Sequence, residues 1–76
     1  MTPQLGDIVL YRWTAQELRL WRPVNADFPE QSPAIVTHLW PNNVVNLTVF
    51  ADTTGGVSRL TKILEGTMPG QWSARA

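Results

Sequence analysis

Two neighbouring runs of β-branched, aliphatic and aromatic residues constrain the fold of this chain most. Residues 34–40 and 44–51 are rich in Val, Ile, Thr, Leu, Trp and Phe, which suit a pleated, half-buried surface. Between them lies Pro41-Asn42-Asn43, where Pro fixes φ and Asn tolerates the left-handed region. The pattern predicts two antiparallel strands joined by a short turn. Because an isolated hairpin is only marginally stable, the rest of the chain has to supply strands that pack on it.

Alternation along these two strands predicts which residues face the core. In the second strand, four apolar residues recur at every second position and are expected to be buried: Val45, Leu47, Val49 and Ala51. Phe50 falls on the opposite face. In the first strand, the same alternation places four residues together on one face: Ala34, Val36, His38 and Trp40. Ile35 and Leu39 lie on its other face, so both faces are partly apolar, as in a strand that bends across a barrel.

Three further strands are predicted. Residues 8–13 follow a Gly6-Asp7 turn, with Val9, Tyr11 and Trp13 on one face. Residues 57–64 have mixed helical and β spacing, and the preceding Gly55-Gly56 pair favours a strand entered through a hairpin turn. Residues 71–73 form a short closing strand after a Gly/Pro loop.

The segment from residue 14 to residue 32 has two interpretations. Thr14 and Glu17 match a capping box, which would begin a short helix that ends before Pro23. The preferred alternative is a long irregular loop, like the one that follows the first strand of SH3-like barrels. The sequence therefore predicts an all-β fold, a small five-stranded SH3-like barrel with a long irregular loop after the first strand, in one domain over residues 1–76.

Composition excludes several classes of site. The 76 residues include no Cys and one His, which excludes disulfides, thiolate metal sites and His-rich zinc sites. No metal or other cofactor is expected. Six Lys/Arg balance six Asp/Glu, so no overall positive field favours duplex nucleic acid. No apolar run reaches the roughly 20 residues of a membrane-spanning helix, and the N-terminus has no signal-peptide pattern.

Four tryptophans are more than a core of this size is expected to bury. At least one is predicted to lie at a surface, and a homo-oligomer is expected to cover the excess apolar area. Trp13, Trp21 and Trp40 are the candidates for that contact.

Three segments, Ser32–Trp40, Val45–Asp52 and Pro69–Trp72, resemble in this order small uncharacterised proteins of tailed phages and prophages. Those proteins pair a Pro-Ala-Ile-Val-Thr-x-x-Trp strand with Val-Asn-Leu-x-Val-Phe-x-Asp and finish with Pro-Gly-x-Trp. The chain departs from the pattern in the Thr-Thr that follows Asp52 and in the tail after Trp72. The resemblance implies a phage origin, with a place in the host cytoplasm or the virion, and an SH3-like barrel. It implies no activity.

Candidate binding residues are mainly aromatic. Tyr11, Trp13, Trp40 and Phe50 could form a platform that grips a cation or a base, although aromatic residues at strand spacing usually serve packing. Asp52 could receive a cationic or amino group beside this platform, or could simply bond its own backbone in a turn.

Basic residues give two weaker candidates. Arg59 and Lys62 could bind a phosphate together with the glycine turn, or could be the solvated face of an edge strand. His38 could act as a general base, but the sequence offers it no partner nucleophile, so a structural role is favoured.

These residues favour a binding protein over an enzyme. The first hypothesis is a phage accessory protein that engages a phage or host protein through exposed aromatics. The second is an oligomer that sequesters a small nucleotide-type host signal between subunits. An oligomeric enzyme with a site between subunits is the third, and it lacks an evident proton donor.

Overall fold

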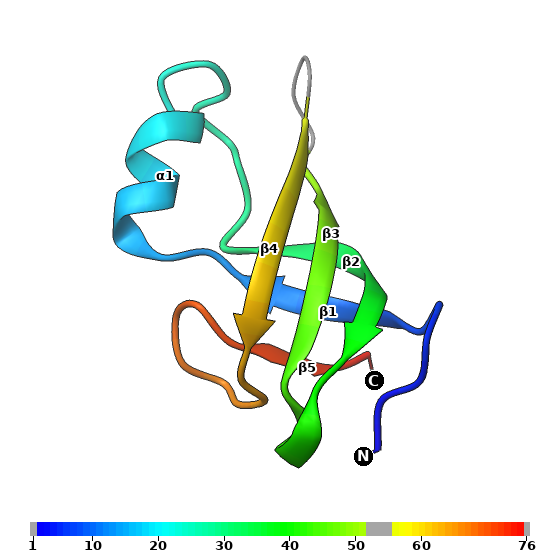
Figure 1. The fold of residues 1–76 in the computed structure, drawn as a ribbon. Helices are drawn as coiled ribbons and strands as arrows, with labels where there is room; N and C mark the ends of the chain where they lie inside the picture. Colours follow the sequence, from blue (N-terminus) through cyan, green and yellow to red (C-terminus); the bar gives the residue numbers. More distant parts are fainter. Residues whose placement is uncertain (1, 52–55, 76) are drawn as a thin grey trace.

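A computed structural model describes residues 2–51 and 56–75. In these residues the chain forms five strands, one helix and one 3₁₀ turn (Figure 1): β1 (Ile8–Arg12), α1 (Ala15–Trp21), β2 (Gln31–Leu39), η1 (Pro41–Asn43), β3 (Val45–Phe50), β4 (Val57–Ile63) and β5 (Trp72–Ala74). The strands make one antiparallel sheet in the order β4-β3-β2-β1-β5. The predicted all-β class, strand number and central hairpin are confirmed.

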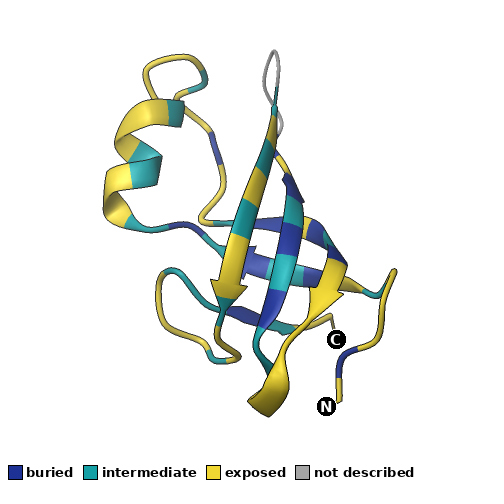
Figure 2. Cartoon of the chain, in the orientation of Figure 1, coloured by how far each residue is buried: buried dark blue, intermediate teal, exposed yellow. Residues whose placement is uncertain are grey.

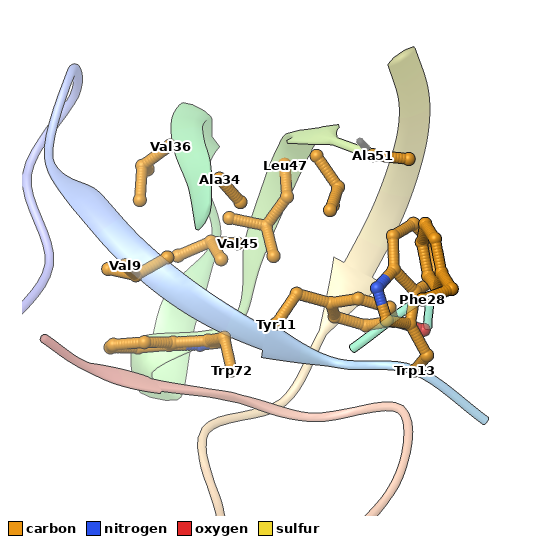
Figure 3. Packing of buried hydrophobic residues seen from close by; sticks show 11 residues of the cluster. Val9, Tyr11, Trp13, Phe28, Ala34, Val36, Val45, Leu47, Ala51 and Trp72 are labelled. Atoms are coloured by element: carbon orange, nitrogen blue, oxygen red, sulfur yellow. The ribbon is translucent and has the colours of Figure 1, made fainter. Parts of the chain in front are cut away.

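The sheet folds over on itself around one core. β1 and β5 run crosswise to β3 and β4, and the long strand β2 pairs with both β1 and β3 (Figure 1). Inward-facing side chains fill the space between the two halves, where Val9 and Trp72 lie across from Val45 and Leu47 (Figure 3). The predicted burial of Val45, Leu47, Val49 and Ala51 is confirmed.

The two edges of the sheet come together near β5. Leu64 follows β4 directly, and its carbonyl accepts a hydrogen bond from the N–H of Trp72 at 3.0 Å. In the described part of the chain an isolated bridge between Glu65 and Trp72, and not a ladder between β4 and β5, joins these edges. The SH3-like barrel therefore remains a prediction, while the five-stranded antiparallel sheet is established.

The segment after β1 begins with a helix, so the preferred interpretation of residues 15–21 as irregular loop was wrong. The capping box forms in full: Thr14 Oγ1 accepts from the Glu17 N–H at 3.1 Å, and Glu17 Oε1 accepts from the Thr14 N–H at 2.9 Å. Trp21 at the end of the helix stacks on Phe28, with ring centroids 5.7 Å apart and an interplanar angle of 19°. Residues 22–30 form the irregular connection to β2.

A β-bulge in β2 changes which face its last residues occupy. Val36 pairs with Leu47 and His38 with Asn46, so Thr37 has no opposite residue on β3. One extra residue reverses the alternation of every residue after it. His38 and Trp40 therefore do not share the core face of Ala34 and Val36 as predicted, and both are exposed.

Candidate functional site

The best-defined surface feature is a cluster that we call the bulge cluster, made of His38, Trp40, Asn46 and Lys62. Asn46 stands at its centre. The Asn46 Oδ1 atom accepts a hydrogen bond from the indole Nε1–H of Trp40 at 2.8 Å and another from the backbone N–H of Lys62 at 2.9 Å. One amide side chain thus ties an exposed aromatic ring to the neighbouring edge strand.

Two bulges flank Asn46 and position this cluster. On one side, the extra residue Thr37 turns His38 outward next to Asn46. On the other side, Thr61 and Lys62 of β4 lie opposite Asn46 alone, because the pairing shifts between Leu47–Leu60 and Val45–Ile63. Bulges of this kind commonly re-aim side chains near functional sites.

Lys62 has a backbone conformation that is energetically unfavourable for a residue with a side chain. Its φ of 55° lies in the left-handed region, which a residue with a Cβ seldom occupies outside turns and bulges. The hydrogen bond from its N–H to Asn46 helps to hold it there. The sequence shows no glycine at this position and so gives no signal for the bulge.

The cluster combines an aromatic surface with positive charge. The Nζ atom of Lys62 lies 5.1 Å from the centroid of the Trp40 ring, a cation–π contact. His38 meets the same indole edge to face, with centroids 4.6 Å apart. Trp40 is 38% exposed. The arrangement presents an oriented, largely apolar ring rimmed by a cation, which suits contact with a protein surface that carries acidic or carbonyl oxygens.

The predicted four-residue aromatic platform does not form. Tyr11 and Trp13 are each only 2% exposed and contact each other in the core, with centroids 5.2 Å apart. Their assignment to an exposed platform was therefore wrong. Trp40 and Phe50 are both exposed, near the start and at the end of β3. Phe50 lies four positions after Asn46, which corresponds to roughly 13 Å along the strand.

The remaining predicted site residues have separate surroundings. Asp52 and Gly55 lie outside the described residues. Arg59 is exposed on the outer face of β4, opposite Thr48. β4 is an edge strand, as the alternative interpretation of Arg59 and Lys62 required.

An apolar strip, interrupted at Thr48, lies on the outer face of the sheet. Phe50 pairs with Val57 of β4, and the two side chains are 42% and 56% exposed. Ile8 pairs with Ile35, and Ile35 pairs in turn with Thr48 of β3. Figure 2 shows that buried and intermediate positions alternate along β3, whereas β4 carries only exposed and intermediate positions. The bulge cluster and this strip thus share the outer face of one sheet.

Sequence reasoning missed the role of Asn46. Its only signal was the Asn-Leu-Thr sequon pattern, which concerns glycosylation and says nothing about Trp40. The pairing between β2, β3 and β4 had to be known before Asn46 could be placed between two bulges.

Metal and membrane features are absent from the residues that the structure describes. In residues 2–51 and 56–75, no group of three or more His, Cys, Asp or Glu side chains is placed to hold a metal ion. In the same residues, no helix has the length and hydrophobicity needed to cross a membrane.

Comparisons of the chain with models of protein families, with curated proteins and with solved structures found no match.

Proposed function

We propose that this chain is a non-enzymatic binding protein whose outer sheet face engages a protein partner through exposed aromatic side chains. The observation that carries the proposal is the Trp40 indole, which Asn46 holds in one orientation at the surface. An aromatic ring whose rotamer is already fixed loses little conformational entropy on binding, and such rings are frequent energetic centres of protein interfaces.

The residues around Trp40 favour a protein as the partner that binds this face. Phe50 and Val57 provide apolar contact area beyond it on the same face, and Lys62 and Arg59 provide polar contacts at the rim. Protein interfaces commonly combine an aromatic or apolar centre with a charged, solvated rim. Pairing of aromatic and cationic groups would also favour a partner surface with acidic side chains.

We further propose that the chain is a phage accessory protein, acting in the host cytoplasm or in the virion. The support is the sequence resemblance over residues 5–12 and 32–72, and the partner would then be a phage or host protein. The alternative is a small nucleotide-type ligand that tryptophan side chains stack on between subunits. Trp13 cannot contribute to such stacking, because it is buried.

Capture from phage-infected bacterial cells tests the proposed function. The tagged chain should retain a specific protein, identified by mass spectrometry, that the Trp40→Ala and Phe50→Ala variants retain much less. Leu20→Ala is the matched control, because Leu20 is an exposed apolar residue on α1, 71% accessible and away from this face. Equal retention by Trp40→Ala and the wild type, or equal loss in Leu20→Ala, would contradict the proposal.

A further inference from the structure

A second surface, independent of the outer sheet face, lies along helix α1. A groove of about 610 Å³ is lined by Ala15, Leu18, Arg19, Arg22 and Pro23. It adjoins an inner pocket of about 200 Å³ that shares Ala15 and Leu18 and is also lined by Arg12, Trp13, Glu30 and Pro69. We call the two together the arginine groove. In Figure 1, α1 lies at the opposite end of the molecule from the turn between β2 and β3 that carries Trp40.

Positive charge is concentrated in this groove. Arg19 lies in the last turn of α1, and Arg22 is its C-cap residue with helical backbone angles, so the two lie on the same side of the helix with Cβ atoms about 5–6 Å apart. Within the described part of the chain, neither forms an ion pair or a side-chain hydrogen bond. The two guanidinium groups repel each other at short range, and a bound anion would remove that repulsion.

Arg12 adds a third guanidinium at the inner end. Its Nη1 atom lies 3.2 Å from Glu30 Oε2, and Glu30 is the one carboxylate among the residues that line the arginine groove. The Nε atom of Arg12 is buried and has no hydrogen-bond partner among the described residues. A buried donor without an acceptor is unfavourable, and a rearrangement of Arg12 around an incoming anion would relieve it.

The size and lining of the groove indicate a small molecule. Ligand pockets commonly have volumes of about 300–1,000 Å³, with mainly apolar walls and a few placed polar groups. Here Ala15, Leu18 and Pro23 supply the apolar wall, and guanidinium groups match carboxylate and phosphate oxygens in a bidentate manner. We propose that the arginine groove binds a small organic anion, with its carboxylate or phosphate on Arg19 and Arg22 and its apolar or ring-bearing body on Leu18 and Pro23.

Titrations of the ¹⁵N-labelled full chain, followed by NMR, test this proposal with four probes. Adenosine monophosphate and octanoate each carry an anionic group and an apolar or planar body, whereas inorganic phosphate and adenosine carry one feature each. At least one of the first two should saturably shift the backbone amides of α1 and the Nε–H signals of Arg19 and Arg22 at millimolar concentration. Which of them does so distinguishes a phosphate ligand from a carboxylate ligand. Phosphate and adenosine should bind much more weakly.

Two variants locate the binding. Arg22→Gln should lower the affinity for the probe that binds by roughly tenfold. This is the effect of losing one charge-assisted hydrogen bond of about 1.4 kcal/mol. Arg59→Gln removes the same charge from β4, outside the groove, and should leave the affinity unchanged. The proposal is wrong if neither organic anion shifts α1, if inorganic phosphate binds as tightly, or if both variants weaken binding equally. None of these outcomes depends on whether Trp40 engages a protein.

Discussion

Asn46 holds Trp40 through a 2.8 Å hydrogen bond from the indole Nε1–H to its side-chain oxygen. The two residues belong to different segments, Trp40 just after β2 and Asn46 in β3. Their contact exists because the extra residue Thr37 turns the end of β2 outward. A local irregularity in strand pairing therefore creates the surface feature on which the proposed function depends.

Removal of the Asn46 side chain should release Trp40. In Asn46→Ala the indole Nε1–H and the Lys62 N–H both lose their acceptor. Because the site is exposed to water, the expected loss of stability is only roughly 1 kcal/mol. The Trp40 indole proton should exchange with solvent markedly faster in NMR spectra. Thr61→Ala, a change at the adjacent bulge that leaves Asn46 intact, should keep the slow exchange, and an unchanged rate in Asn46→Ala would contradict this structure of the cluster.

Leu47 should be a major contributor to stability. It is 1% exposed in the centre of β3, and Leu47→Ala removes buried methyl groups and leaves a cavity. The expected loss in the free energy of unfolding is about 2–4 kcal/mol, measured by chemical denaturation. The neighbouring change Thr48→Ala, on the outer face, should alter it by less than about 0.5 kcal/mol. An unchanged denaturation midpoint in Leu47→Ala would show that Leu47 is not in the core.

Tyr11 should make the protein less stable at high pH. Burial, and then the hydrogen bond to Glu17 and its negative charge, raise the pKa of Tyr11 above its ordinary value. In the unfolded chain the phenol ionises near its ordinary pKa of about 10. Above that pH the unfolded state has lost a proton that the folded state keeps, so the free energy of unfolding falls as pH rises; below it, this contribution is fully present.

The single tyrosine makes this prediction simple to measure. Ultraviolet absorbance of tyrosinate should appear in the folded protein only well above pH 10 and together with unfolding. Tyr11→Phe should remove most of the alkaline slope of stability, although it also removes the hydrogen bond to Glu17. Reversible tyrosinate formation near pH 10 in the folded chain would contradict the burial of this side chain.

Self-association remains a prediction from the excess of apolar surface. Of the predicted contact residues, Trp13 is buried and is excluded, whereas Trp40 is exposed. A second copy of the chain could cover Trp40 together with the exposed Phe50, Val57 and Ile8 of the outer face. Sedimentation at micromolar concentration should detect a species of at least twice 8.5 kDa, and Phe50→Asp should shift it toward monomer. A monomer of the wild-type chain under these conditions would remove this interface.

The sequence predicted the buried strands better than it predicted the surface. Val45, Leu47 and Val49 alternate on β3, so periodicity alone identified their buried face. For Val9, Tyr11 and Trp13 it predicted a shared face but not that this face is buried. The helix was also encoded locally, in the Thr14–Glu17 capping box. This local signal predicts residues 15–21 better than the analogy with the loop of a barrel does.

The candidate site could not be predicted because pairing, not local sequence, determines it. From Ala34 to Trp40 the pattern continues without a break, and nothing in it marks Thr37 as an extra residue. The sequence also gives no signal for the left-handed backbone conformation of Lys62, because no glycine occupies that position. By contrast, the positive φ values of Asn42 and Asn43, 64° and 60°, agree with the predicted turn chemistry.

Oxidative footprinting of Trp40 tests the central proposal most directly. In the free chain, hydroxyl radicals should oxidise Trp40, which is 38% exposed, far more than Trp13 or Trp72, which are 2% and 0% exposed. When the chain has captured its partner from phage-infected cells, oxidation of Trp40 should fall at least severalfold, while that of Leu20 on α1 stays constant. Equal oxidation of Trp40 in the free and the bound chain would contradict the proposal that this residue forms the binding surface.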